Sequence, residues 1–122
     1  MLVEDHAAFR GALAFLLDNE PDMEVAAEAG SLAEARDALW GGPLEGNLDV
    51  AVLDIGLPDG DGRDLIGELL LRDADVSVLV LSASVEAAGL EEALRAGADA
   101  VLEKVEAPLA IAHEVRRLAA DG

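Results

Sequence analysis

The sequence predicts a single α/β domain built on a five-stranded parallel sheet, doubly wound, with helices on both faces. Two observations lead to this prediction. Short apolar runs alternate with segments of helical period along the chain, and the run at residues 76–81 is almost continuously apolar, as in a buried central strand. Such alternation implies parallel strands joined by right-handed crossovers. A length of 122 residues suits one domain with one core, and we expect residues 1–122 to form it.

The first strand is expected at residues 1–3 and the second at 23–29, with a helix over 7–20 between them. That helix places four apolar side chains on one face: Phe9, Leu13, Leu16 and Leu17. Both of its phenylalanines, Phe9 and Phe15, are expected in the core.

The second helix is expected over residues 31–40, because Ser31 and Glu34 have the spacing of a capping box. Trp40 ends this amphipathic segment and is expected to pack against the protein. A turn-rich loop, 41–47, then leads into the third strand at 48–53.

The second half of the chain alternates in the same way. One predicted helix ends before Gly97, and the last one begins at Pro108, which is favoured in a first helical turn. The remaining expected elements are a helix at 63–72, a strand at 76–81, a helix at 86–96, a strand at 99–103 and a helix at 108–120.

Composition excludes several classes of protein. There are 26 acidic and 8 basic residues, a formal net charge of −18, and only three aromatic side chains, so a nucleic-acid surface is not expected. The absence of cysteine excludes disulfides and thiolate metal sites. No apolar run is long enough to cross a membrane and no signal peptide is recognisable, so we expect a cytoplasmic protein without membrane contact.

Chemically active side chains follow four of the five predicted strands. These are Glu4 and Asp5 after the first, Asp54 after the third, Ser82 after the fourth and Lys104 after the fifth. In open parallel sheets, ligands bind at the carboxyl ends of the strands. Acids after strands are commonly helix caps and turn formers. The combination with Lys104, the single lysine of the chain, favours a shared site instead.

Three converging carboxylates repel one another unless a cation is present, and oxygen ligands suit Mg²⁺. Lys104 could hold a carboxylate or a phosphoryl oxygen, and Ser82 could donate one hydrogen bond. A metal, a cation and a donor around one carboxylate are the equipment for phosphoryl transfer, with Asp54 as the nucleophile.

On these residues the chain resembles the receiver domain of two-component response regulators, over essentially all 122 residues. The acidic pair of that family is matched by Glu4 and Asp5. Its hydroxyl followed by Ala is matched by Ser82 and Ala83, and its lysine 22 residues later by Lys104. Its phosphoacceptor motif is matched by Asp54, Leu57, Pro58, Asp61 and Gly62.

The resemblance implies a flavodoxin-like (CheY-like) fold and phosphorylation of Asp54 by a sensor histidine kinase. It implies that Ser82 and Lys104 assist, and that Mg²⁺ or Mn²⁺ binds Glu4, Asp5, Asp54 and the main-chain carbonyl of Gly56. Such a domain catalyses only its own phosphorylation and dephosphorylation. The resemblance further implies that phosphorylation switches the loop at Ser82 and the face formed by the fourth helix, fifth strand and fifth helix, which the family often uses for dimers or output.

Finer features resemble the NarL/FixJ type of regulator. They are His6 after the acidic pair, the stretch "PDMEVAAEAGS", and "GADAVLEK" with Pro108 four residues after its lysine. Members usually continue into a LuxR-like DNA-binding domain, which this sequence lacks, so we expect a stand-alone or an excised receiver. Two departures are the short first strand and Val101, where the family commonly has Tyr or Phe.

Other interpretations fit less well. A haloacid-dehalogenase-type phosphatase needs a second Asp where Gly56 stands, and an EF-hand fails at Asp64 and Leu70. His6 and His113 are expected to be surface residues rather than zinc ligands. The alternative from another class is a degenerate receiver that acts as a protein-interaction module without phosphorylation.

Overall fold

The computed structural model describes residues 1–41, 44, 46–83, 87–104 and 108–121. Its main sheet contains β1 (Leu2–Val3), β2 (Glu28–Ala29), β3 (Val50–Asp54), β6 (Ser77–Ser82) and β7 (Ala100–Glu103). The strand order is β2-β1-β3-β6-β7, and every neighbouring pair is parallel. The predicted five-stranded parallel sheet is therefore confirmed.

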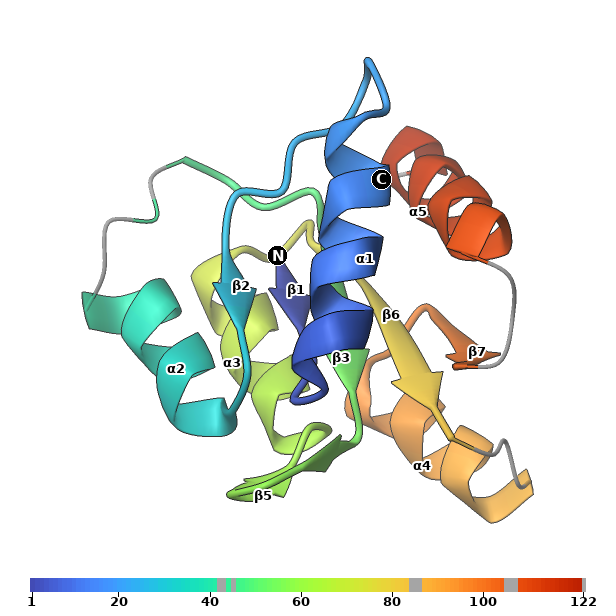
Figure 1. Cartoon of the computed structure of the whole chain (residues 1–122). Helices are drawn as coiled ribbons and strands as arrows, with labels where there is room; N and C mark the ends of the chain where they lie inside the picture. Colours follow the sequence, from blue (N-terminus) through green and yellow to red (C-terminus); the bar gives the residue numbers. More distant parts are fainter. Residues whose placement is uncertain (42–43, 45, 84–86, 105–107, 122) are drawn as a thin grey trace.

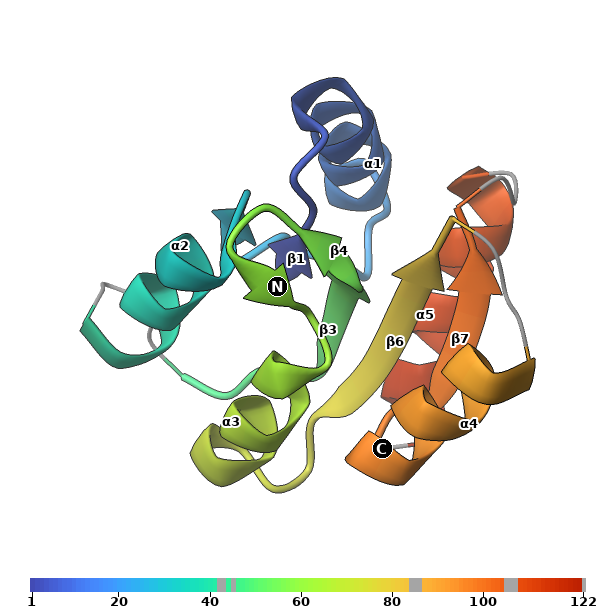
Figure 2. The same cartoon turned by 90° about the horizontal axis from the view of Figure 1, so that it is seen from below.

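Helices cover both faces of this sheet (Figures 1 and 2). On one side lie α1 (Ala7–Asp18) and α5 (Pro108–Asp121). On the other lie α2 (Leu32–Arg36), α3 (Asp64–Arg72) and α4 (Ala87–Ala96). No helix in the described part of the chain is both long and apolar enough to cross a bilayer.

Alternation along each strand divides the core into two layers. In β6, Val78 and Val80 pack toward α2, α3 and α4, whereas Leu79 and Leu81 pack toward α1 and α5. Successive side chains of a strand point to opposite faces, so a strand buried on both sides must be apolar throughout. This explains the continuous apolar run that marked β6 in the sequence.

The first two strands are shorter than the sequence predicts. The expected second strand, 23–29, is reduced to Glu28–Ala29, because β1 offers only two residues for pairing. The Val25 N–H instead donates to the Asp18 carboxylate, at 2.8 Å. The first helix likewise ends at Asp18, two residues earlier than expected.

Two aromatic residues differ from expectation. Phe15 is 73% exposed, so its placement in the core was wrong; the buried face of α1 is formed by Leu13, Ala14 and Leu17, and Phe15 lies on the opposite side of the helix. The expected helix 31–40 changes after α2 into a π-helical turn, Asp37–Gly41. Trp40 in that turn is more than half exposed, and its indole N–H donates to Glu68 at 3.2 Å.

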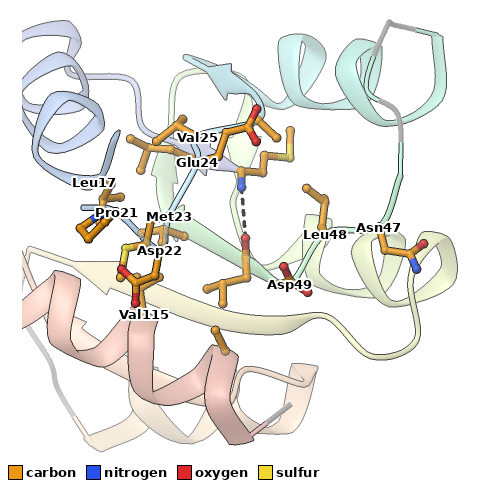
Figure 3. A pocket seen from close by; sticks show the side chains of 16 residues that line it. Leu17, Pro21, Asp22, Met23, Glu24, Val25, Asn47, Leu48, Asp49 and Val115 are labelled. Atoms are coloured by element: carbon orange, nitrogen blue, oxygen red, sulfur yellow. Dashed lines mark hydrogen bonds between the residues drawn. The ribbon is translucent and has the colours of Figure 1, made fainter. Parts of the chain in front are cut away.

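A cavity of about 630 Å³ opens at the amino ends of β1 and β3 (Figure 3). Leu17 and Val115 from the two helices on one face line it together with Leu48, which precedes β3. The side chains that suggest phosphoryl chemistry follow the opposite, carboxyl ends of the strands. This cavity is therefore no part of the candidate site.

Candidate functional site at the carboxyl ends of the strands

The strand register brings the predicted site residues to one end of the sheet. β1 and β3 are neighbours with Val3 opposite Leu53, so Glu4 and Asp54 are the next residues on adjacent strands. On the other side, β6 pairs with both β3 and β7, and the Lys104 N–H donates to the Ser82 carbonyl at 2.8 Å. The strand ends converge as the parallel topology predicts.

Glu4, Asp5 and Asp54 form an acidic cluster. One carboxylate oxygen from each lies within 4.8 Å of the others. Glu4 is fully buried, Asp54 is 5% exposed and Asp5 is exposed. Two carboxylates of the cluster are thus buried and the third faces solvent.

Glu4 uses its two oxygens unequally. Oε1 accepts from the His6 backbone N–H at 3.0 Å and from Lys104 at 2.8 Å. Oε2 is buried and has no hydrogen-bond partner among the described residues. A buried, unpartnered carboxylate oxygen beside two further carboxylates fits a hard divalent cation such as Mg²⁺, which prefers oxygen ligands.

Lys104 reaches both buried acids. Its Nζ lies 2.8 Å from Glu4 Oε1 and 3.3 Å from Asp54 Oδ2, and 5.3 Å from the centroid of the Phe9 ring. The sequence predicted that Lys104 could hold a carboxylate; the structure shows that it contacts two, Asp54 and, at the shorter distance, Glu4. One ammonium therefore compensates part of the charge of two carboxylates.

The surroundings shift the pKa values of this pair. Burial, followed by the charge of Glu4, raises the pKa of Asp54 from 3.8 to about 6, against the opposing effects of the Gly56 N–H and Lys104. Burial lowers the pKa of Lys104, but the hydrogen bond to Glu4 and the charge of Asp54 outweigh it, so the net shift is upward. Lys104 stays charged, and Asp54 is a carboxylate whose ionisation is costly.

Gly56 contacts this centre, whereas Ser82 and Val101 lie on the two strands next in the sheet, β6 and β7. The Gly56 N–H donates to Asp54 Oδ1 at 3.1 Å, which fixes the orientation of that carboxylate. Ser82 ends β6 and is half-buried, one strand away from Asp54. Val101 lies opposite Val80 and packs partly buried against the α2–α3–α4 side of the core.

The segment after Asp54 is more ordered than a plain loop. It forms a small antiparallel hairpin of β4 (Gly56–Leu57) and β5 (Gly60–Asp61), which the sequence interpretation missed. At its end a Cβ on Gly62 would lie 2.0 Å from the Asp54 carbonyl oxygen, while the Gly62 N–H donates to the Ile55 carbonyl at 2.8 Å. Only glycine allows the chain to return this closely to the Asp54 backbone.

His6 and His113 are both exposed, as expected of surface residues. His6 also has a local structural role, because its side chain caps α1 by accepting from the Phe9 N–H at 3.3 Å. Histidine is not among the residues that commonly cap helices, so nothing in the sequence predicted this cap.

Comparison with known families agrees with this geometry. Residues 1–116 match the model of the response regulator receiver domain. The chain belongs to this family. The receiver domain is a module of two-component signalling proteins, and the five-stranded sheet with its 2-1-3-4-5 strand order is the fold that the resemblance implied.

Relatives of this receiver domain include regulators of the NarL/LuxR kind. The chain is 36% identical to the DNA-binding transcriptional activator DevR/DosR of Mycobacterium tuberculosis over 98% of its length and 53% of that protein. It is 37% identical to the transcriptional regulatory protein UhpA of Salmonella typhimurium, covering 99% of the chain and 58% of the relative. The chain thus spans little more than half the length of these relatives.

Solved structures give the same result. The receiver domain of the putative response regulator NarL from Mycobacterium tuberculosis superposes with a TM-score of 0.84 at 28% identity, covering 99% of this chain and 94% of that one. A LuxR-family response regulator from Aurantimonas sp. SI85-9A1 also gives 0.84, at 25% identity, with 99% and 84% covered. The resemblance to a NarL-type receiver domain is confirmed.

Proposed function

We propose that this receiver domain accepts a phosphoryl group on Asp54 from a sensor histidine kinase. The observation that supports this most directly is the environment of Asp54. It is a nearly buried carboxylate at the end of the central strand, touched by Lys104 on one oxygen and by the Gly56 N–H on the other. Both donors hold the carboxylate in one orientation.

In the proposed transfer, a carboxylate oxygen of Asp54 forms a new O–P bond while the bond between phosphorus and the donor nitrogen breaks. The bonding electron pair leaves with that nitrogen. The product is an acyl phosphate on Asp54. Lys104 lies 3.3 Å from Asp54 Oδ2 and is placed to neutralise charge on the incoming phosphoryl oxygens, and the Ser82 hydroxyl is proposed to donate to one of them.

Mg²⁺ is the cation that we propose for the acidic cluster, and Mn²⁺ would serve in its place. Asp5, Asp54 and the main-chain carbonyl of Gly56 would hold the ion directly, and Glu4 would hold it largely through water. A bound divalent cation supplies neutralisation of negative charge during phosphoryl transfer. The buried oxygen of Glu4 and the close approach of the three carboxylates support this assignment.

The output is proposed to be transcription. DevR/DosR and UhpA, which the chain resembles, are named as transcriptional regulators and are about twice as long as the matched segment. The receiver itself has few bases and is not expected to contact DNA.

A second copy of the chain is proposed to dock on the face formed by α4, β7 and α5. On this side, α4 and α5 carry the exposed Leu94 and Leu109.

The test is phosphorylation by a small phosphodonor in the presence of Mg²⁺. Intact-mass analysis should show one added phosphoryl group in the wild type, and peptide mapping should place it on Asp54. Asp54→Asn should gain none. Asp59→Asn is the matched control: Asp59 lies in the same segment but caps α2, accepting from Leu32 and Ala33, so this variant should be phosphorylated as the wild type is.

Equal phosphorylation of the wild type and Asp54→Asn would place the phosphoacceptor elsewhere. No phosphorylation of the wild type, by the small donor or by purified histidine kinases, would favour the phosphorylation-independent interaction module instead.

A further inference from the structure

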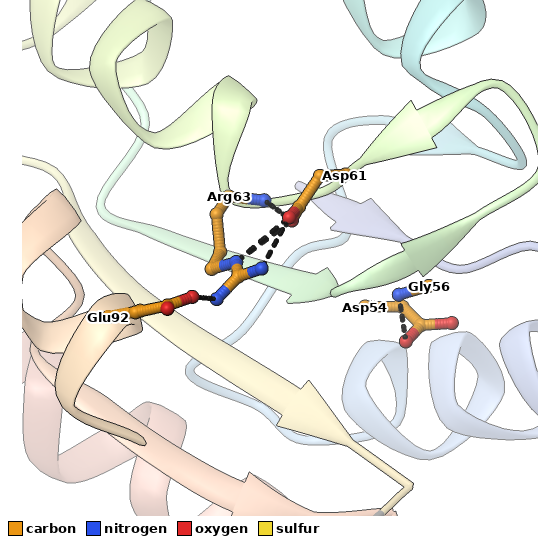
Figure 4. Close-up of polar contacts among 5 residues, drawn as sticks. All are labelled: Asp54, Gly56, Asp61, Arg63 and Glu92. Atoms are coloured by element: carbon orange, nitrogen blue, oxygen red, sulfur yellow. Dashed lines mark hydrogen bonds and ion pairs between the residues drawn. The ribbon is translucent and has the colours of Figure 1, made fainter. Parts of the chain in front are cut away.

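Arg63 connects the segment that follows Asp54 to helix α4 (Figure 4). It stands between the β4–β5 hairpin and α3, where it is the residue before the first helical turn. Its guanidinium contacts the carboxylates of Asp61 in the hairpin and of Glu92 in α4. The site described above uses neither Arg63 nor Glu92.

Asp61 fixes the position of the guanidinium. Arg63 Nε lies 3.0 Å from both carboxylate oxygens of Asp61, and Nη2 lies 2.5 Å from Oδ2. The Arg63 backbone N–H donates to the same carboxylate at 2.9 Å. Asp61 therefore sets both the backbone and the side-chain direction of Arg63, in the planar fork geometry that arginine favours. The third nitrogen, Nη1, is left pointing at Glu92 (Figure 4).

The same hairpin is bonded to the phosphoacceptor. Gly56 donates its N–H to Asp54 Oδ1, and in the hairpin Gly56 is the residue paired with Asp61. A continuous series of contacts thus runs from Asp54 through Gly56 and Asp61 to Arg63, and from there to Glu92 on α4. Each step is a hydrogen bond, a strand pairing or an ion pair.

We propose that Arg63 is a coupling residue that transmits the state of Asp54 to α4 through the hairpin, by a route separate from Ser82. This inference rests on the proposed function. When the new O–P bond forms on Asp54 Oδ2, the oxygen beside Lys104, Oδ1 becomes the carbonyl oxygen of a mixed anhydride and no longer shares a carboxylate charge. Hydrogen bonds to charged acceptors are roughly twice as strong as neutral ones, so the hold on Gly56 weakens. Movement of Gly56 shifts its partner Asp61, and with it the guanidinium that holds Glu92.

A purely stabilising role explains the pair less well. Glu92 is 61% exposed, and exposed ion pairs contribute little to stability. Arg63 is only 25% exposed and is oriented by Asp61, so its contact with α4 is placed by the hairpin and not by chance encounter in solvent. Because Asp61 fixes the guanidinium on the hairpin side, the contact of Nη1 ties the position of Glu92 on α4 to the position of the hairpin.

The test measures hydrogen exchange in α4 with and without beryllofluoride and Mg²⁺, which together mimic the phosphoryl group. In the wild type we expect a change of protection in residues 89–96. In Glu92→Gln and in Arg63→Met this change should fall to less than half, while the global unfolding midpoint of Glu92→Gln stays that of the wild type. The double variant should respond as Arg63→Met alone does, because both substitutions remove the same link.

Glu91→Gln is the matched control. It removes an ion pair on the same helix, with Arg95, that does not reach the hairpin, so its response should equal that of the wild type. A full response in Glu92→Gln would overturn the coupling role while leaving phosphorylation of Asp54 intact. An unresponsive wild type would also overturn the coupling role, and the phosphodonor experiment, which does not depend on α4, would show separately whether the proposed function fails.

Discussion

Asp54 is an acidic side chain held where an ionised carboxylate is poorly solvated. Its pKa is raised from 3.8 to about 6, chiefly by burial and then by the charge of Glu4. The native state therefore binds a proton more tightly than the unfolded chain. The stabilisation linked to this group is fully present below its unfolded pKa and is lost as the pH rises through the native value.

Asp54→Asn removes the free-energy cost of keeping an ionised carboxylate at this buried position at neutral pH. Without divalent cations at pH 7, we expect the variant to be more stable than the wild type, by on the order of 1–3 kcal/mol. At pH 4 the difference should largely vanish, because Asp54 is then protonated in the folded wild type. Urea unfolding at both pH values measures this, with the exposed Asp75→Asn as the control that should show no such change. An Asn variant that is less stable at pH 7 would contradict the assigned cause.

Lys104 offsets part of the free-energy cost of burying the two carboxylates of Glu4 and Asp54. Lys104→Met would leave Glu4 and Asp54 without their shared cation, and a buried charge without a partner is costly. We expect a loss of about 1–3 kcal/mol in urea unfolding at pH 7. The control Arg95→Met, which breaks an exposed pair, should lose little.

Adding Asp54→Asn to Lys104→Met should restore part of that loss, because one of the two uncompensated charges disappears. The two substitutions would then be non-additive, as expected of residues in contact. Strict additivity would show that Lys104 stabilises the fold by another contact, such as that with the Phe9 ring.

Among the elements, those with a strong apolar period were predictable from sequence. β6, α3 and α5 lie within two residues of their expected bounds. The continuous apolar run of β6 matches a strand buried on both faces, and the helical apolar period of α3 and α5 matches the one face that each helix buries. β2 was not predictable, because its length is limited by β1, its partner in the sheet. The β4–β5 hairpin was also missed, since a two-residue strand has too few side chains to show alternation.

The sequence predicted which residues share the site, but it did not predict which of their side chains contact one another. Topology alone places residues that follow parallel strands at one edge of the sheet, so Glu4, Asp54 and Lys104 were brought together correctly. Which carboxylate Lys104 approaches more closely depends on side-chain conformations that no spacing in the sequence encodes. Arg63 and Glu92 are 29 residues apart in the sequence, and their contact depends on how α4 packs. This contact could therefore be found only in the structure.

Substitution of Gly62 tests whether the chain at the end of the β4–β5 hairpin must pass close to the Asp54 backbone. In Gly62→Ala the new methyl group would meet the Asp54 carbonyl oxygen, so the hairpin or β3 must shift, and we expect a loss of about 1–3 kcal/mol together with slower phosphorylation. Gly67→Ala is the matched control. Gly67 lies inside α3 with open space around its Cβ position, so alanine should stabilise the protein by up to about 1 kcal/mol. Equal effects of both substitutions in thermal unfolding would refute the close approach.

For the whole molecule, charge is the property that connects fold and function. A net charge of −18 on 122 residues means that the compact state repels itself, and three of its acids are gathered at one end of the sheet. Any added salt should stabilise the protein by screening. A specific cation effect must therefore be separated from this general one.

A Mg²⁺ titration at fixed ionic strength separates the two effects. At fixed ionic strength, Mg²⁺ at ten times its dissociation constant should stabilise the native state by about 1.4 kcal/mol, because it binds the folded cluster and not the unfolded chain. For a domain of this size that is a rise of about 2–8 °C in Tm. The rise should be lost in Asp54→Asn and in Asp5→Asn, which each remove a proposed ligand, and retained in Glu91→Gln, which removes the same charge far from the cluster. If all four proteins gained equally from Mg²⁺, the ion would be acting on the overall negative charge, and the acidic cluster would not be its site.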